Sequence, residues 1–238
     1  MDQGRAERGC HVGRLHASIV AAVQVEIVSD VVCPWCYIGK RRFEKALDDL
    51  RHTLPSLEVR VRYRAYQLDP SAPIDAPSPV VDSYAKRFGG PERAAEIIAR
   101  VSEVAAAEGI EFRMAQALRA NTRRAHRLLK FVEVHAEHLQ SSVNERLMQA
   151  YFHDGLDIGD PVVLAQSARD AGFQHPLLDT MLSTEADEWS QRVMDDLVWA
   201  ADRDITAVPT FVIDDAMVIP GAQDTSMFVR ILRKLADK

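Results

Sequence analysis

Two cysteines separated by two residues form the motif Cys33-Pro34-Trp35-Cys36, whose residue types and spacing could carry redox chemistry. An alternating apolar segment typical of a strand precedes the motif, and an amphipathic helical pattern follows it. Pro34 suits the first turn of a helix, so Cys33 is expected at the helix N-terminus, where unpaired backbone N–H groups stabilise a thiolate. Cys36 is expected one turn further in, close enough to form a disulfide but shielded from solvent. The motif therefore predicts an attacking sulfur and a resolving sulfur.

The same spacing is also half of a structural zinc site, which needs four preorganised ligands. The remaining cysteine, Cys10, is followed by His11, and these two residues are the best candidates for the other two ligands. The eight histidines show no ligand-like pairing with a second closely spaced cysteine. We therefore predict no metal site.

The composition is that of a globular protein with a sizeable core, because 47% of the 238 residues are hydrophobic. A net charge of -6 argues against nucleic acid and anionic membrane as partners, since both favour a basic surface. Three cysteines, two of them in one motif, are unlike a secreted disulfide scaffold. A reducing compartment, the cytoplasm, is the expected location.

Residues 1–22 are expected to form a disordered or N-terminal tail in which Cys10 is an incidental thiol. The apolar stretch of residues 17–23 follows several arginines and could instead be the core of a signal peptide. It continues directly into the first predicted strand, which leaves little room for a cleavage site. Export is therefore the less favoured interpretation.

Helical spacing after the motif predicts a helix of about four turns, with Cys36 and Phe43 inward and Lys40 largely outside the apolar face. Residues 57–65 alternate strictly and predict a half-buried strand whose arginines form a solvated face. Four prolines within residues 69–79 mark a boundary.

The rest of the chain divides into a helical part and a second part with strands. Helices are predicted at residues 92–108, 121–139, 141–153 and 161–171, then at 185–203. Two short strands follow at residues 210–213 and 217–219, joined by the two-residue turn Asp214-Asp215, and a last helix covers residues 224–235. The predicted fold is α/β: a small mixed sheet flanked by helices, formed by residues 23–78 and 185–238, with an all-helical insertion at 79–184.

This layout resembles the thioredoxin-like fold of the DsbA-like family, and its FrnE-like branch in particular. That branch is related to 2-hydroxychromene-2-carboxylate isomerase and the kappa-class glutathione transferases. The resembling segments are SDVVCPWCYIGKRRFEKAL, YRAYQLDP, NTRRAHRLL, GLDIGDPVVL, AVPTFVI and PGAQ.

The resemblance implies roles for five residues around the motif. Cys33 would be the nucleophile, and Cys36 would resolve the mixed disulfide. Pro209 would follow a cis peptide bond beside the cysteines, and the Val208 backbone would pair with an extended substrate. Trp35 joins Val208 and Pro209 in the implied substrate-binding set.

Three departures from the family pattern bear on function. A buried acid expected six residues before the nucleophile is replaced by Ile27, which leaves Asp30 and Glu26 as candidates for proton transfer, unless they serve only solvation or capping. The pair between the cysteines is Pro-Trp rather than Pro-His, which predicts a less strongly oxidising couple than DsbA. Finally, Asp204 and Ala207 stand where many relatives have glycine, and Asp204 is expected to tolerate a left-handed conformation.

The expected function is a thiol-disulfide oxidoreductase or isomerase acting on protein or peptide thiols and disulfides. It would need no cofactor, although glutathione could be a co-substrate. The alternative is a glutathione-dependent isomerase or transferase of the kappa or 2-hydroxychromene-2-carboxylate isomerase type, which normally has serine at the position of Cys33. A third hypothesis is a redox-sensing or chaperone-like binding module. The sequence specifies neither the physiological substrate nor the oligomeric state.

Overall fold

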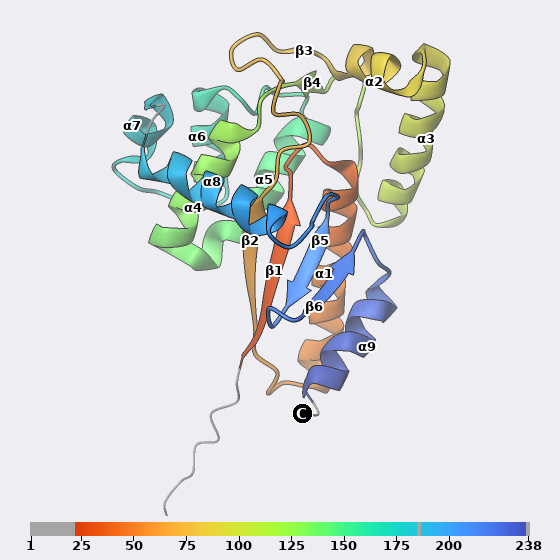
Figure 1. The fold of residues 1–238 in the computed structure, drawn as a ribbon, viewed down its shortest axis with the longest axis vertical. Helices are drawn as coiled ribbons and strands as arrows, with labels where there is room; N and C mark the ends of the chain where they lie inside the picture. The colour runs from red at the N-terminus through yellow and green to blue at the C-terminus, as the bar shows by residue number, and fades with distance from the viewer. Residues whose placement is uncertain (1–21, 185–186, 237–238) are drawn as a thin grey trace, which may run out of the picture.

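A four-stranded mixed sheet lies at the centre of the computed structural model, which describes residues 22–184 and 187–236. Its strands are β1 (Val23–Ser29), β2 (Val59–Ala65), β5 (Thr210–Ile213) and β6 (Met217–Pro220), in the order β2-β1-β5-β6. β1 runs parallel to β2 and antiparallel to β5, and β6 runs antiparallel to β5 (Figure 1). The predicted small mixed sheet is confirmed.

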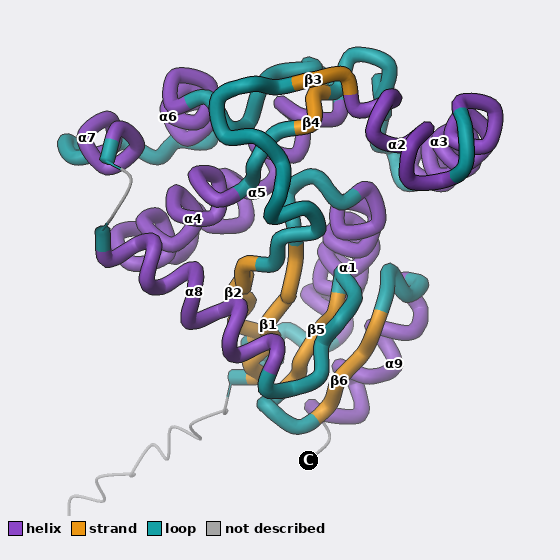
Figure 2. The backbone as a smooth tube through the Cα atoms, turned by 45° about the horizontal axis from the view of Figure 1, so that its top comes forward, coloured by secondary structure: helices purple, strands orange, loops and turns teal. Residues whose placement is uncertain are grey.

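Helices α1 (Pro34–Thr53) and α9 (Thr225–Ala236) cover one face of the sheet (Figure 2). Three buried rings join them: Phe43 of α1 lies 5.4 Å from Phe211 of β5 and 5.2 Å from Phe228 of α9, measured between centroids. Fully burying each such ring contributes roughly 1.5–3 kcal/mol. This core explains the apolar spacing of both helices in the sequence.

Helix α8 (Glu188–Ala201) packs on the opposite face, where alternation along β1 and β5 presents Val28 and Val212 to Ala200. The chain leaves α8 through Asp204 in the left-handed conformation, with φ of 55°, while the Ile205 N–H donates to the Ala200 carbonyl. The expected left-handed Asp204 is confirmed.

A mainly helical segment joins β2 to α8 and lies at one end of the sheet (Figure 1). Its helices are α2 (Val80–Phe88), α3 (Pro91–Ala107), α4 (Arg123–Ala136), the short 3-10 helix η1 (Glu137–Leu139), α5 (Gln140–Phe152), α6 (Pro161–Asp170) and α7 (Leu178–Ser183). Two short strands, β3 (Ser78–Pro79) and β4 (Leu118–Arg119), pair antiparallel within it. The segment is therefore not entirely helical, because the chain on either side of α2 and α3 is tied together by this pairing.

The hydrophobic core of this helical segment includes both cysteines of the motif. Cys33, Cys36 and Ile38 belong to the same buried cluster as Leu128 of α4 and Leu147 of α5. The start of α1 thus packs into the helical segment, whereas its later turns pack under the sheet.

Several local predictions need correction. The β5–β6 turn contains three residues, because Asp214 and Asp215 both take positive φ and Ala216 follows them before β6. Lys40 is only 3% exposed, since Glu44 (2.8 Å) and Glu145 (2.6 Å) neutralise its ammonium group. Arg64 is not solvated either, because it is paired with two carboxylates.

Within the described ranges, every helix is too short or too polar to cross a lipid bilayer.

Candidate active site

Cys33 caps the N-terminus of α1, and Pro34 occupies the first helical position as predicted. The Cys33 carbonyl accepts the first helical bonds, from the N–H groups of Cys36 (3.0 Å) and Tyr37 (3.3 Å). The first turn of α1 carries no acidic side chain, so no carboxylate there competes for the positive helix end. Cys33 therefore lies at the positive end of the α1 dipole.

The two sulfurs occupy different environments, and both cysteines are free thiols. Cys33 is 4% exposed and its Sγ lies 3.7 Å from the Val208 carbonyl oxygen, to which it can donate. Burial, reinforced by the nearby Cys33, raises the pKa of the Cys36 thiol well above its ordinary value. Hydrogen bonding by the Ser29 side chain and by the Asp30 backbone opposes that rise in the pKa. Cys36 therefore needs help to lose its proton.

The peptide bond between Val208 and Pro209 is cis, which confirms the prediction. Pro209 packs closely on α1 at Gly39, where a Cβ atom would lie only 3.0 Å from the proline Cγ. The absence of a side chain at Gly39 therefore lets this loop approach the helix of the cysteines.

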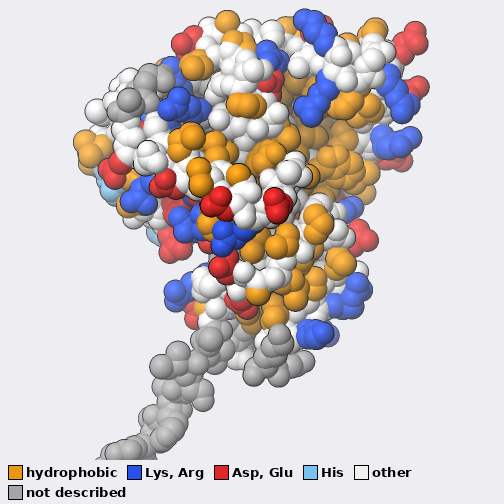
Figure 3. Space-filling view, viewed as in Figure 1, with side chains coloured by type: hydrophobic (Ala, Val, Ile, Leu, Met, Phe, Trp, Pro, Cys, Tyr) orange, Lys and Arg blue, Asp and Glu red, His pale blue; other side chains and the backbone are white. Residues whose placement is uncertain are grey.

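A pocket of about 280 Å³ opens beside Cys33, Trp35 and Val208. Helices α2 and α3 form its apolar wall, and hydrophobic side chains gather beside these helices in the space-filling view (Figure 3). The wall residues are Val80, Tyr84, Phe88, Ile97 and Val101, and burial raises the pKa of Tyr84 to about 12. Arg87, Arg119 and Asp69 add charge to the lining. Trp35 is 42% exposed, so the motif presents an aromatic side chain to incoming molecules.

Sequence reasoning missed α2, although a signal was available. Val80, Tyr84 and Phe88 follow one another at four-residue spacing, and Gly89-Gly90 ends the pattern. The proline-rich stretch before it obscures the helix start, because prolines such as Pro79 usually interrupt helices.

Asp30 lies directly behind the motif and is fully buried. Its Oδ2 accepts the Leu68 N–H at 2.8 Å, and its Oδ1 lies 3.1 Å from His126 Nε2 on α4. The Asp30 carboxylate is therefore buried against Leu68 and His126, a histidine absent from the predicted site residues, and only the Asp30 backbone is a hydrogen-bonding partner of Cys36.

The comparisons with known proteins agree with this geometry. A family model described as DSBA-like thioredoxin domain matches residues 24–233. The chain belongs to the DsbA-like thioredoxin family. The predicted resemblance is thus confirmed, and the matches are consistent with its FrnE-like branch.

Individual relatives of this DsbA-like chain cover most of its length. The uncharacterized protein YwbO of Bacillus subtilis is 28% identical over 211 residues, which are 88% of this chain and 96% of YwbO. The probable DsbA oxidoreductase SCO1869 from Streptomyces coelicolor is 31% identical with a TM-score of 0.81, over 91% of each chain. The cytosolic disulfide reductase DsbM from Pseudomonas aeruginosa, solved with GSH, shares the fold at 14% identity and a TM-score of 0.60, covering 90% of this chain and 97% of DsbM.

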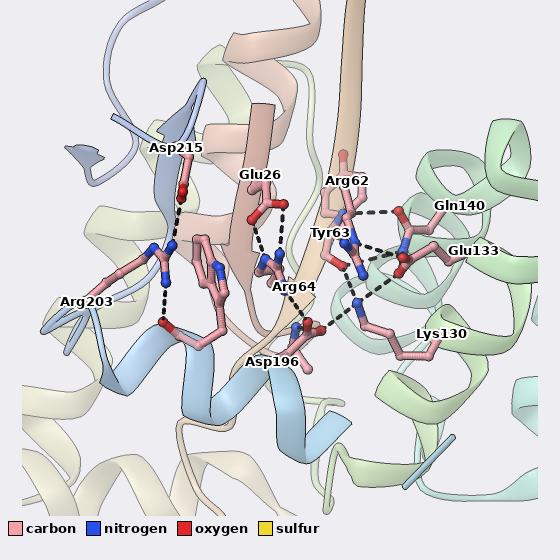
Figure 4. A network of polar contacts seen from close by, with 12 residues as sticks. Glu26, Arg62, Tyr63, Arg64, Lys130, Glu133, Gln140, Asp196, Arg203 and Asp215 are labelled. Atoms are coloured by element: carbon pink, nitrogen blue, oxygen red, sulfur yellow. Dashed lines mark hydrogen bonds and ion pairs between the residues drawn. The ribbon is translucent and has the colours of Figure 1, made fainter. Parts of the chain in front are cut away.

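Glu26, the second candidate for proton transfer, lies elsewhere in the DsbA-like fold. Its carboxylate pairs with Arg64, which also pairs with Asp196 of α8 at 2.9 Å. Asp196 lies 2.5 Å from Lys130 of α4, so the ion pairs continue from β1 to α4 (Figure 4). The structure thus places Glu26 in an ion-pair network rather than beside the cysteines.

The described part of the chain holds no group of three or more histidine, cysteine, aspartate or glutamate side chains placed to bind a metal ion. Cys10, which the zinc alternative would need, lies outside the described residues.

Proposed function

We propose that this DsbA-like protein is a thiol-disulfide oxidoreductase or isomerase that exchanges disulfides through Cys33 and Cys36. One observation carries the proposal: Cys33 sits at a helix N-terminus facing a pocket, and Cys36 lies buried behind it. A Cys33 thiolate attacks a substrate disulfide, and Cys36 then displaces the substrate from the mixed disulfide. The reverse sequence passes the Cys33–Cys36 disulfide to substrate thiols.

Protein or peptide substrates are favoured by the surface around Trp35. A second hollow of about 230 Å³ adjoins the pocket and shares Trp35, Ile97 and Val101 with it. The second hollow adds the charged side chains of Arg93, Glu96 and Arg100 to this surface, so the two hollows together offer both apolar and charged contacts. Val208 borders the pocket and precedes the cis Pro209, which supports a role for this loop in binding an extended segment.

Glutathione is proposed as a co-substrate and the cytoplasm as the location. The support comes from DsbM, a cytosolic disulfide reductase with the same fold that was solved with GSH. No cofactor is needed, because the electrons pass between sulfur atoms.

Reduction of insulin disulfides and reactivation of scrambled ribonuclease, each with and without glutathione, test this function. Turnover without glutathione is expected and supports the oxidoreductase or isomerase. An absolute requirement for glutathione, with activity on a small electrophile only, would favour the isomerase or transferase alternative. A stable disulfide with little turnover would favour the redox-sensing module.

Trapping tests the separate roles of the two cysteines. Cys36→Ser should accumulate mixed disulfides visible on a non-reducing gel, because the resolving sulfur is gone. Cys33→Ser should not. Trapping by Cys33→Ser alone would reverse the assignment.

A further inference from the structure

A small enclosed cavity of about 10 Å³ lies between the end of β1, β2, α4 and α5. Its polar lining comes from Ser29, His126, Lys130 and Asn144. This volume is about that of one water-sized sphere. The cavity is separate from the pocket in front of Cys33, with which it shares no lining residue.

The side-chain amide of Asn144 indicates that a small polar molecule occupies the cavity. It is 1% exposed, and neither its Oδ1 nor its Nδ2 finds a hydrogen-bond partner among the described residues. An amide buried in this way is strongly unfavourable unless something else bonds to it. A single water molecule can donate to Oδ1 and accept from Nδ2, and the polar lining offers it further partners.

The cavity is linked to Cys36 through one hydroxyl group. Ser29 lines the cavity, and hydrogen bonding by its side chain lowers the otherwise raised pKa of the Cys36 thiol. On its other side the cavity meets His126, which is 2% exposed and whose Nε2 pairs with Asp30 Oδ1 at 3.1 Å. A carboxylate at Nε2 favours the tautomer that leaves the lone pair on Nδ1.

We propose that Asn144 holds a water molecule in this cavity, and that Ser29, this water and His126 form a relay that takes the proton of the Cys36 thiol. The inference rests on the proposed function and supplies the proton acceptor that is missing because Ile27 replaces the acid. Asn144 and Ser29 are positioning residues, while His126, paired with Asp30, accepts the charge.

The relay acts when substrate is bound to Cys33 as a mixed disulfide. The Cys36 S–H bond breaks, its proton passes to the relay, and the Cys36 sulfur attacks the Cys33 sulfur. The Cys33–Cys36 bond forms as the bond from Cys33 to substrate breaks, and substrate leaves as a thiolate that takes up a proton from solvent. The two cysteines are oxidised and the substrate disulfide is reduced, so no further reagent is required.

The charges around the relay permit a proton to reside on His126. An imidazolium there would form an ion pair with Asp30, by the same logic as a catalytic base held by a carboxylate. Lys130 does not oppose this, since Asp196 (2.5 Å) and Glu133 (2.8 Å) neutralise it. The other titratable or charged groups facing the relay or its immediate surroundings are Cys33 and Cys36 of the motif, Tyr63 and Arg64 of β2, and Tyr151 of α5.

Stopped-flow reaction of the reduced protein with 5,5′-dithiobis(2-nitrobenzoate) separates the two steps. The first nitrothiobenzoate leaves when Cys33 attacks, and the second leaves when Cys36 resolves the mixed disulfide. Asn144→Leu replaces the amide by an apolar group of similar size. We expect it to slow the second phase about 100-fold at pH 7. The first phase should change less than about 2-fold, and the deficit should shrink as pH rises because hydroxide replaces the relay.

Asn144→Ala is the matched control, because it leaves room for additional water. It should keep most of the rate of the second phase, although it enlarges the cavity. A purely structural role for Asn144 predicts the opposite order, with the cavity-forming Asn144→Ala variant the more impaired.

The outcomes are distinguishable. A second phase in Asn144→Leu within about 2-fold of the wild type overturns the relay and leaves the proposed function intact. A deficit in Asn144→Leu that does not change with pH also overturns it. A wild-type protein that releases only one nitrothiobenzoate overturns the proposed function itself, and the relay with it.

Discussion

Two buried polar clusters meet on one face of α4, one turn apart, and they are built differently. The ion-pair network contains Lys130 with Glu26, Arg62, Arg64, Glu133 and Asp196, and three carboxylates balance three cations. The relay cluster contains His126 with Ser29, Asp30 and Asn144, and its buried amide lacks a partner within the described chain. The first cluster is balanced in charge and holds elements together, whereas the second has an unpartnered amide that can bind a water and so help to pass a proton.

The ion-pair network should show its role in stability. Asp196 is 2% exposed and bridges Arg64, Lys130 and the Ala65 N–H. Asp196→Ala leaves a buried lysine without one of its two carboxylates, so we expect the free energy of unfolding to fall by about 3–5 kcal/mol. Urea denaturation measures it.

Arg93 and Glu96 provide a matched exposed pair, and Glu96→Ala should cost less than about 1 kcal/mol. An equal loss of unfolding free energy in the two variants would mean that the network stabilises the fold no more than an exposed ion pair does.

The buried Cys36 thiol should affect how the free energy of unfolding changes at alkaline pH. The folded pKa of Cys36 is raised, chiefly by burial, so above about pH 8.5 the unfolded chain releases a proton that the folded protein keeps. Stability therefore falls as pH rises, with a slope of up to about 1.4 kcal/mol per pH unit from this one thiol.

Urea melts of reduced wild type and Cys36→Ala between pH 7.5 and 9.5 measure the difference. That window stays below the ordinary pKa of the tyrosines, and the variant should lose the Cys36 contribution. Parallel profiles for the two proteins would contradict a protonated, buried Cys36.

The smallest effect is expected where the relay amide itself is replaced. If a water satisfies Asn144, Asn144→Leu exchanges a bonded amide for an apolar contact, and the free energy of unfolding should change by no more than about 1 kcal/mol. A clear stabilisation would instead mean that the amide is truly unsatisfied in the native protein. Thermal and urea denaturation of the same preparations used for stopped flow decide this.

Much of the fold could be predicted because its signals are local. The Cys33-Pro34-Trp35-Cys36 motif, the β5 boundaries and the left-handed Asp204 each depend on a few neighbouring residues. The start of the helix predicted at residues 161–171 is similar, since the Asp160 Oδ1 accepts the Val162 N–H at 2.8 Å.

The parts that were missed depend on distant partners. Arg64 alternates like an exposed residue, yet Asp196 lies 132 positions away and buries it. Lys40 is held by Glu145, which is 105 positions away. The residues next to His126 in the sequence do not indicate a function, because its partner Asp30 is distant in the sequence and close only in the fold. Charge pairing over such separations is invisible to periodicity.

Because the two cysteines lie in the core of the helical segment, their redox state is linked to the stability of that core. Whatever free energy the disulfide adds to or removes from that core must appear, with the same magnitude, in the reduction potential of the couple. A substitution in α4 or α5 that favours the dithiol form by ~1.4 kcal/mol would raise the potential by about 30 mV without touching either sulfur. The helical segment therefore helps to set the reduction potential of the couple and also forms a wall of its pocket.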